Sequence, residues 1–305
     1  MNDTGHFDGI YTPVITPYRA DGAIDYPGLE TVIEFLVESG VHGIICGGTT
    51  GEYYAQTLQE RIALIHFTQT RLAGRLPLTV GTGAIRQADS LALARCAREV
   101  GADSILIGSP PYALPTEQEN ALNALAIDHQ ADLPIMLYNY PDRMGVAMGE
   151  VFLNHVSRSG NLCGIKESSG DINRIHRLTH DYPSIRLGCG MDDQALEFLA
   201  WGARFWVCAG ANFLPREHLA LHRACVIEGD FTKGRQIMSA MLPLMWLLEQ
   251  SGQFVQTIKQ GVALAGLPSG PPRPPLKALN QANQNTLAQT IATLKTTLAA
   301  IDNPD

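Results

Sequence analysis

The chain has 305 residues, of which 45% are hydrophobic and 17% charged, so it can bury a large core as one (β/α) barrel or as two ordinary domains. Its formal net charge of −8 argues against a nucleic-acid partner, and no apolar run reaches the roughly 18 residues that span a membrane. The first residues show no secretory signal, and the six cysteines include no CxxC pair, so we predict a reduced, cytoplasmic protein.

Short apolar segments alternate with longer segments of helical periodicity. The segments predicted as strands are 9–15, 43–47, 78–81, 104–107, 134–138, 162–166, 185–188 and 205–209. Most are too apolar to alternate between buried and exposed positions, which is typical of parallel strands buried on both faces. Helices are predicted between them, for example over 25–40, 57–74 and 88–101, the first with Asp25 as its N-cap and Gly40 at its end. Eight strand–helix units predict an α/β fold, a (β/α)8 TIM barrel.

The pattern changes after residue 228, and no further strand is predicted there. Helical periodicity covers 231–252 and 253–267, a proline-rich connector covers 266–276, and a final amphipathic helix covers 283–301. We therefore predict a TIM barrel catalytic domain in residues 1–228 and a C-terminal helical subdomain in residues 229–305.

Lys166 ends the sixth predicted strand and is the one lysine among the first 232 residues. In a TIM barrel the reaction takes place at the C-terminal ends of the strands. Apolar neighbours there disfavour the ammonium form, and a neutral amine can attack a ketone to form a Schiff base. The alternative is a surface lysine at a strand end in a chain that otherwise uses arginine.

Candidate proton-transfer groups follow the neighbouring strands. Tyr138 ends the fifth predicted strand, so its hydroxyl can approach Lys166 and shuttle the proton that imine chemistry requires. Thr49 and Thr50, after the second strand, could relay that proton. The glycines of the same turn, Gly48 among them, could direct backbone N–H groups at a carboxylate. The alternative for this segment is a tight strand-to-helix turn.

Other patterns predict neither a metal nor a cofactor. Histidine pairs with i, i+4 spacing occur at positions 176/180 and 218/222, but no third ligand is evident near either pair. Neither a dinucleotide-binding fingerprint nor a P-loop is present. No pair of catalytic carboxylates is apparent, and we expect Asp192 and Asp193 to cap a loop or to accept hydrogen bonds.

Three segments carry a family resemblance: "GGTTGE" at 47–52, "YNYP" at 138–141 followed by Arg143, and "GIKESSGD" at 164–171. They resemble the signature segments of the dihydrodipicolinate synthase / N-acetylneuraminate lyase superfamily, and they occur in the same order at the ends of strands two, five and six. The resemblance covers the whole chain. It implies a class I Schiff-base lyase that acts on pyruvate or a 2-keto acid without a cofactor, commonly as a homotetramer built as a dimer of dimers.

The resemblance also implies a role for each matching residue. Lys166 is implied to be the Schiff-base lysine, Tyr138 and Thr49 the proton relay, and Tyr112 a tyrosine that reaches across a dimer interface into the neighbouring site. The residues implied to bind substrate are Thr50 and Gly48 near the pyruvate carboxylate, Arg143 on the carboxylate of the second substrate, and Val207 beside the lysine.

Some positions depart from the synthase pattern. Pro111 precedes Tyr112 where synthases have two adjacent tyrosines, and Ile85 stands where feedback-inhibited bacterial synthases have an asparagine. The loop "YYAQTLQER" is closer in length to that of the lyase branch. The predicted activity is therefore 4-hydroxy-tetrahydrodipicolinate synthase-like, joining pyruvate to aspartate semialdehyde. The alternatives are a catabolic aldolase or dehydratase of 2-keto-3-deoxy sugar acids or sialic-acid-like substrates, and a non-catalytic keto-acid-binding member.

Overall fold

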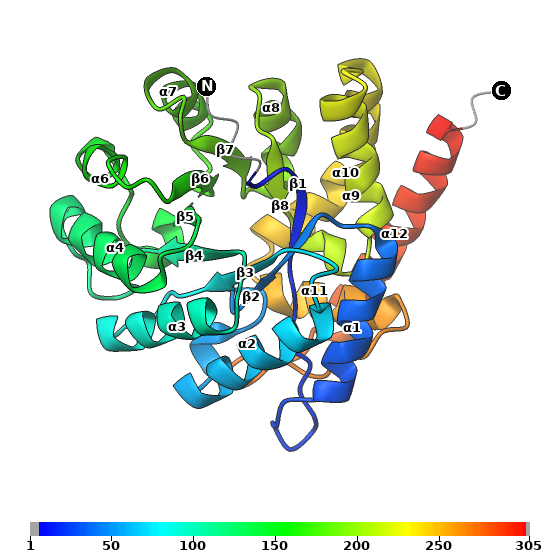
Figure 1. Ribbon diagram of the computed structural model, residues 1–305. Helices are drawn as coiled ribbons and strands as arrows, with labels where there is room; N and C mark the ends of the chain where they lie inside the picture. The colour runs from blue at the N-terminus through cyan, green and yellow to red at the C-terminus, as the bar shows by residue number, and fades with distance from the viewer. Residues whose placement is uncertain (1–5, 303–305) are drawn as a thin grey trace.

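The computed structural model describes residues 6–302 and contains a closed barrel of parallel strands in the order β1 to β8 (Figure 1). The strands are β1 (Gly9–Pro13), β2 (Gly43–Cys46), β3 (Leu78–Gly81), β4 (Ser104–Gly108), β5 (Ile135–Asn139), β6 (Leu162–Glu167), β7 (Arg186–Cys189) and β8 (Phe205–Val207). Strand β8 pairs with β1 and closes the barrel. The predicted (β/α)8 fold is confirmed, and each strand ends within about two residues of its predicted end.

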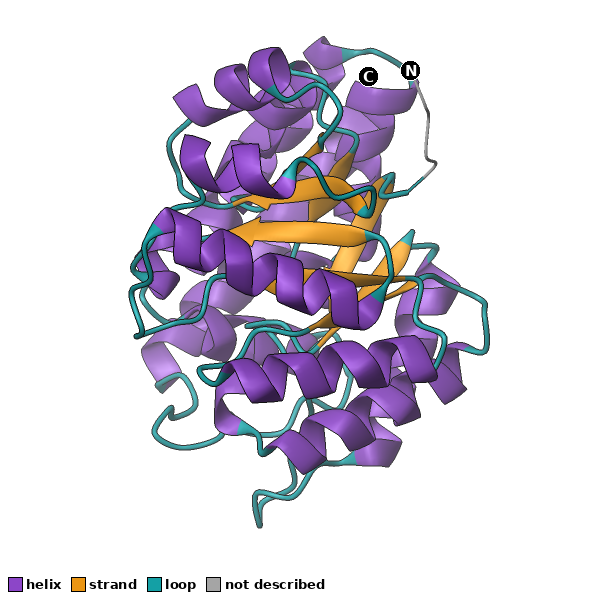
Figure 2. Ribbon diagram, turned by 60° about the vertical axis from the view of Figure 1, so that its left-hand side comes forward, coloured by secondary structure: helices purple, strands orange, loops and turns teal. Residues whose placement is uncertain are grey.

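Helices surround the barrel on its outer side (Figure 2). They are α1 (Tyr26–Ser39), α2 (Leu58–Leu72), α3 (Gln87–Glu99), α4 (Glu117–Ala131), α5 (Pro141–Met144), α6 (Glu150–Val156), α7 (Asn173–Asp181), α8 (Ala195–Ala200) and α9 (Pro215–His222). The short turns are η1 (Tyr53–Ala55), η2 (Asp192–Gln194), η3 (Gly210–Asn212) and the π-helical η4 (Arg223–Ile227).

Local signals explain where the first helices begin and end. Asp25 Oδ1 accepts the backbone N–H of Gly28 at 3.2 Å at the start of α1, and Gly40 ends this helix with a left-handed φ of 77°. Helix α2 begins with a capping box, in which Thr57 and Glu60 each bond the backbone N–H of the other. The predicted ends of α1 are thus confirmed.

Two apolar layers hold the barrel together. The larger lies between the strands and the surrounding helices. The smaller fills the inside of the barrel and consists of Phe7, Tyr11, Ile45, Leu106, Met136, Tyr138, Met144, Cys163, Phe205 and Val207. Each strand buries apolar side chains in both layers, and this burial stabilises the barrel. The strand sequences are therefore continuous apolar runs.

Three more helices follow the eighth strand–helix unit: α10 (Phe231–Gln250), α11 (Phe254–Leu264) and α12 (Gln281–Asp302). Helix α12 packs along α10 at the side of the barrel (Figure 1). The predicted helical character of this part is therefore confirmed. The domain boundary after residue 228 stays a prediction, and residues 1–5 and 303–305 lie outside the described part of the chain.

A buried ion pair connects this helical part to the barrel. Lys259 Nζ on α11 lies 2.6 Å from Glu52 Oε1, and the two side chains are 3% and 0% exposed. The backbone N–H of Arg273 donates to the other Glu52 oxygen at 2.9 Å. Glu52 directly follows the turn that carries Thr49 and Thr50. Removing one partner of a buried pair leaves an unpaired charge and costs about 3–5 kcal/mol, so the C-terminal helices and this turn are energetically coupled.

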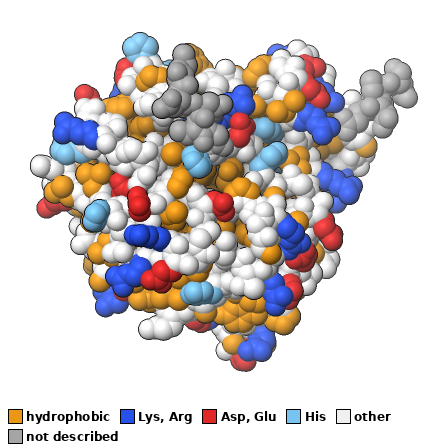
Figure 3. All heavy atoms as spheres, viewed as in Figure 1, with side chains coloured by type: hydrophobic (Ala, Val, Ile, Leu, Met, Phe, Trp, Pro, Cys, Tyr) orange, Lys and Arg blue, Asp and Glu red, His pale blue; other side chains and the backbone are white. Residues whose placement is uncertain are grey.

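The surface charges, the helix lengths and the clusters of possible metal ligands were compared with what nucleic-acid, membrane and metal binding require. On the face in Figure 3, Lys and Arg side chains are interspersed with Asp and Glu. Within residues 6–302, no helix is both long and apolar enough to cross a membrane. The same residues contain no cluster of three or more His, Cys, Asp or Glu side chains that could hold a metal ion.

Candidate active site

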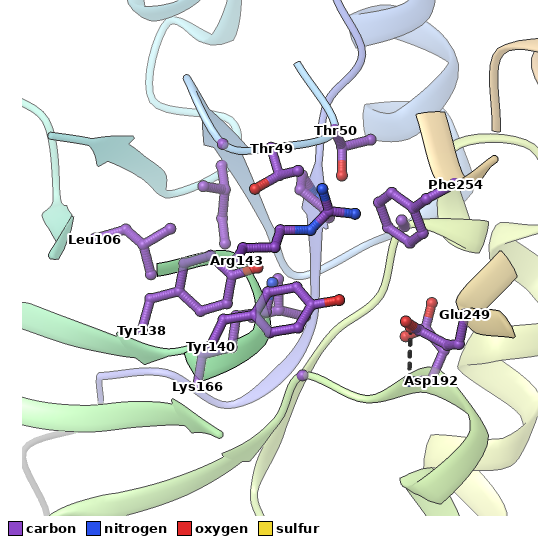
Figure 4. Close-up of a pocket in the computed structure, with 16 residues that line it drawn as sticks. Thr49, Thr50, Leu106, Tyr138, Tyr140, Arg143, Lys166, Asp192, Glu249 and Phe254 are labelled. Carbon is purple, nitrogen blue, oxygen red and sulfur yellow. Dashed lines mark hydrogen bonds between the residues drawn. The ribbon is translucent and has the colours of Figure 1, made fainter. Parts of the chain in front are cut away.

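One pocket opens at the C-terminal ends of the strands and collects most of the predicted site residues (Figure 4). Those that line it are Gly48, Thr49, Thr50, Tyr138, Arg143, Lys166 and Val207. The other lining residues are Pro13, Ile45, Leu106, Tyr140, Gly190, Asp192, Ala209, Glu249 and Phe254. The pocket is therefore apolar toward the inside of the barrel and polar around its mouth.

The barrel register brings Lys166 and Tyr138 together. The two residues are direct partners in the β5–β6 ladder, so their side chains point to the same side. Lys166 Nζ lies 4.1 Å from the centroid of the Tyr138 ring. A Cβ on Gly190 would lie 2.7 Å from Lys166 Cγ, so glycine at this position leaves room for the lysine side chain.

The surroundings of Lys166 favour its neutral form. Burial lowers the pKa of its amine, and the negative charges of Asp192 and Glu249 oppose this effect. A lowered pKa increases the fraction of free amine at neutral pH, which is the form that can attack a ketone. The position and the electrostatics both fit the predicted nucleophile.

Tyr138 is 6% exposed, and burial is the main reason that its pKa is raised above the usual range. Hydrogen bonding with Thr49 and the charge of Arg143 act in the opposite direction. The phenol therefore stays protonated at neutral pH, so it can donate a proton and recover one through Thr49. The predicted contact between the tyrosine and this threonine is present.

The turn after β2 uses some of its backbone N–H groups for hydrogen bonds of its own. Gly47 has a left-handed φ of 79°, which glycine adopts without strain. The backbone N–H of Gly51, however, donates to Gly48 O at 3.1 Å, and that of Glu52 donates to Thr49 O at 2.9 Å. The turn therefore uses these two N–H groups itself, and carboxylate binding by its other backbone N–H groups stays a prediction.

Arg143 lies on the short helix α5, directly after β5. Its guanidinium carbon is 5.3 Å from the centroid of the Tyr140 ring and 5.7 Å from that of Phe254. The two rings hold the guanidinium at the mouth of the pocket (Figure 4). This placement fits a carboxylate clamp better than the alternative of a surface arginine paired with Asp142.

Tyr112 lies outside the pocket of its own chain. Its side chain is 89% exposed and sits on the turn after β4 with a left-handed φ of 72°. A bulky residue adopts this backbone conformation only when the surrounding structure requires it. The tyrosine thus projects away from the chain, as a residue presented to a neighbouring subunit would.

The pocket is also lined by two acidic residues in contact with each other, Asp192 and Glu249. The backbone N–H of Asp192 donates to Glu249 Oε1 at 3.2 Å, and Asp192 Oδ1 accepts the indole N–H of Trp206 at 2.8 Å. Burial raises the pKa of both carboxyl groups. Asp192 is a hydrogen-bond acceptor as predicted. Its position directly after β7 is the sequence signal that could have identified it as a pocket residue. No local pattern marks Glu249, which lies 57 residues further along the chain.

Residues 6–294 match the model of the dihydrodipicolinate synthetase family. The chain belongs to this family. The assignment confirms the predicted superfamily and the predicted enzyme class, a Schiff-base lyase.

Individual relatives cover nearly the whole chain. The chain is 30% identical to 4-hydroxy-tetrahydrodipicolinate synthase of Methanosphaerula palustris, over 94% of this chain and 99% of the relative. The solved structure of 4-hydroxy-tetrahydrodipicolinate synthase from Methylacidiphilum fumariolicum SolV is 31% identical with a TM-score of 0.90, over 97% of this chain and 98% of that one. The E. coli K12 prophage protein YagE of this family, solved in complex with pyruvate, is 28% identical with a TM-score of 0.88, over 95% and 99%.

Proposed function

We propose that the chain joins pyruvate to an aldehyde, or cleaves the product, through an imine on Lys166. The observation that carries the proposal is the amine of Lys166, held 4.1 Å from the centroid of the Tyr138 ring at the catalytic end of a closed barrel. The leading activity is that of 4-hydroxy-tetrahydrodipicolinate synthase, with aspartate semialdehyde as the second substrate. The names of the relatives support this choice.

The proposed steps assign one role to each side chain. The neutral amine of Lys166 bonds to C2 of pyruvate, and the keto oxygen leaves as water after protonation, for which Tyr138 is the donor. The Tyr138 phenolate takes a proton from C3, and the electrons of that C–H bond pass to the iminium and give an enamine, whose C3 attacks the aldehyde carbon. Tyr138, which hydrogen bonds with Thr49, then protonates the new alkoxide. Water adds to the iminium carbon, releases the product and the Lys166 amine, and returns a proton to the phenolate.

The test is a panel of aldehydes with pyruvate. Purified protein is incubated with pyruvate and aspartate semialdehyde, and consumption of both is followed with product identification by mass spectrometry. Turnover of aspartate semialdehyde well above that of other aldehydes supports the synthase. An imine with pyruvate but no turnover of aspartate semialdehyde rules out this activity.

A second activity is favoured by the acidic pair in the pocket. Asp192 and Glu249 lie beside Lys166, where carboxyl groups can bind the hydroxyl groups of a sugar acid. The same imine would then cleave or dehydrate a 2-keto-3-deoxy sugar acid. The panel therefore includes such acids, and release of pyruvate from one of them identifies this activity.

Replacement of Arg143 by alanine is expected to raise the Michaelis constant of the acidic second substrate by about tenfold or more. A guanidinium forms two parallel hydrogen bonds with a carboxylate, at roughly 1.5–3 kcal/mol for a charged contact, and 1.4 kcal/mol corresponds to a factor of ten. Steady-state kinetics with each substrate varied in turn measure the effect. The yield of the trapped pyruvate imine should stay unchanged. Loss of this imine, or unchanged kinetics for both substrates, contradicts the role of a clamp.

We further propose a homo-oligomer, a tetramer built as a dimer of dimers, in the cytoplasm. If Tyr112 acts in the site of a neighbour, a Lys166→Ala chain and a Tyr112→Phe chain are each defective alone. A mixed dimer of the two contains one site with both residues intact. Mixing after partial unfolding should therefore restore activity that neither variant has alone. Activity that stays at the mean of the two variants, or a fully active monomer in sedimentation, contradicts the proposal.

A further inference from the structure

Two acidic side chains line the pocket without a role in the proposed bond-making steps. Asp192 comes from η2, directly after β7, and Glu249 from the last turn of α10. They lie together on the side of the pocket opposite Tyr138 and Tyr140 (Figure 4). The hydrogen bond from the Asp192 backbone to Glu249 Oε1 holds the second carboxyl group in place.

The two carboxyl groups differ in their partners. Asp192 is 2% exposed, and the Trp206 indole and the positive charge of Lys166 stabilise its ionised form. Glu249 has fewer donors, and burial together with the charge of Asp192 raises its pKa. Two like charges held close together favour keeping one proton between them. The pair thus offers an acceptor on Asp192 and a proton on Glu249 at the same place.

No cation within the described residues 6–302 is left to neutralise the two carboxyl groups during the proposed reaction. The cation that lowers the pKa of both groups is Lys166, and the proposed reaction needs its amine in the neutral form. The buried hydroxyl of Ser168 has no hydrogen-bond partner among the described residues. It lies against Gly190, where an added Cβ would be 2.0 Å from its Oγ. The two carboxyl groups line the pocket and have more acceptor positions than the hydrogen bonds they receive, which points to a ligand.

We propose that Glu249, with Asp192, selects the second substrate by binding a hydrogen-bond donor, hydroxyl or ammonium, on the carbons between its aldehyde and its carboxylate. The proposal rests on the proposed imine chemistry. A substrate with its aldehyde at Lys166 and its carboxylate at Arg143 presents its middle carbons to the acidic pair. A hydrocarbon chain at this place would displace water from both carboxyl groups without replacing its hydrogen bonds, which disfavours its binding.

Two matched pairs of aldehydes test the proposal with pyruvate as the first substrate. Aspartate semialdehyde and succinate semialdehyde differ only in the ammonium group. Glyceraldehyde and propanal differ only in the hydroxyl groups. The ratio of kcat/KM within each pair is measured for the unchanged chain, for Glu249→Leu and for Glu249→Gln. Gln250→Leu, one residue along the same helix and outside the pocket lining, is the control.

We expect the unchanged chain to prefer the polar member of at least one pair by about tenfold or more, and Glu249→Leu to remove this preference. If the ligand group is a hydroxyl, Glu249→Gln keeps part of the preference, because an amide still donates and accepts hydrogen bonds. If it is an ammonium, its charge favours ionisation of Glu249, which the amide of Glu249→Gln cannot reproduce, so this variant keeps less of the preference than it does for a hydroxyl. Equal rates within both pairs for the unchanged chain, or an unaltered preference in Glu249→Leu, overturn the proposal.

Two controls distinguish failure of the proposed role of Glu249 from failure of the proposed imine chemistry. All variants should give the borohydride-trapped pyruvate adduct and the melting temperature of the unchanged chain. An unchanged chain that forms no adduct refutes the imine chemistry itself. Normal adducts with an unaltered aldehyde preference refute only the role of Glu249.

Discussion

Replacement of Lys166 by alanine is expected to abolish covalent capture of pyruvate. The unchanged chain, incubated with pyruvate and borohydride, should gain the mass of one reduced pyruvate imine per chain. The amine of Lys166 is buried at the catalytic end of β6, and its lowered pKa provides the free base that attacks a ketone. Intact mass spectrometry followed by peptide mapping measures the adduct and its position. Turnover should fall with the adduct, because every later step takes place on the imine.

The control for this experiment is Lys277→Ala. Lys277 is exposed directly after the proline-rich connector and lies outside the pocket lining, so its loss should leave both the adduct and turnover unchanged. A pyruvate adduct that persists in Lys166→Ala would place the nucleophile elsewhere. Melting curves of both variants show whether the buried substitution changes the fold.

The barrel could be predicted because its determinants are local. Each strand is a short apolar run, since both of its faces are buried, and each helix between strands follows a helical period with recognisable caps. Asp25 and Gly40, for example, mark both ends of α1 in the sequence. The order of eight such units then leaves few arrangements other than a closed parallel barrel.

The site could be predicted only where its residues lie at strand ends. Lys166 and Tyr138 are each the last residue but one of their strands, β6 and β5, so the topology alone brings them together. Glu249 reaches the same pocket from α10, and its position depends on how the C-terminal helices pack against the barrel. The use of the Gly51 N–H inside its own turn was equally beyond prediction, because it depends on backbone torsion angles that a sequence of glycines and threonines does not determine.

Replacement of Tyr138 by phenylalanine is expected to lower kcat by roughly 10²–10⁴-fold, the usual effect of losing a positioned acid–base group. The ring stays, so its packing in the inside of the barrel and its contact with Lys166 Nζ stay as well. Only the hydroxyl that hydrogen bonds with Thr49 is lost. Single-turnover measurements should show slower imine formation and slower carbon–carbon bond formation, because both steps move a proton through this group.

The matched control is Tyr140→Phe, which removes the same atom from the neighbouring ring. The centroids of the two rings are 5.8 Å apart and both residues line the pocket, but Tyr140 packs against Arg143 rather than against Lys166. Its loss should therefore change the Michaelis constant of the acidic substrate more than kcat, which we expect to stay within about tenfold. If Tyr138→Phe keeps kcat within about twofold, or if the two variants are equally slow, proton transfer does not pass through Tyr138. Added small phenols or amines that rescue Tyr138→Phe alone would support its role as the proton donor.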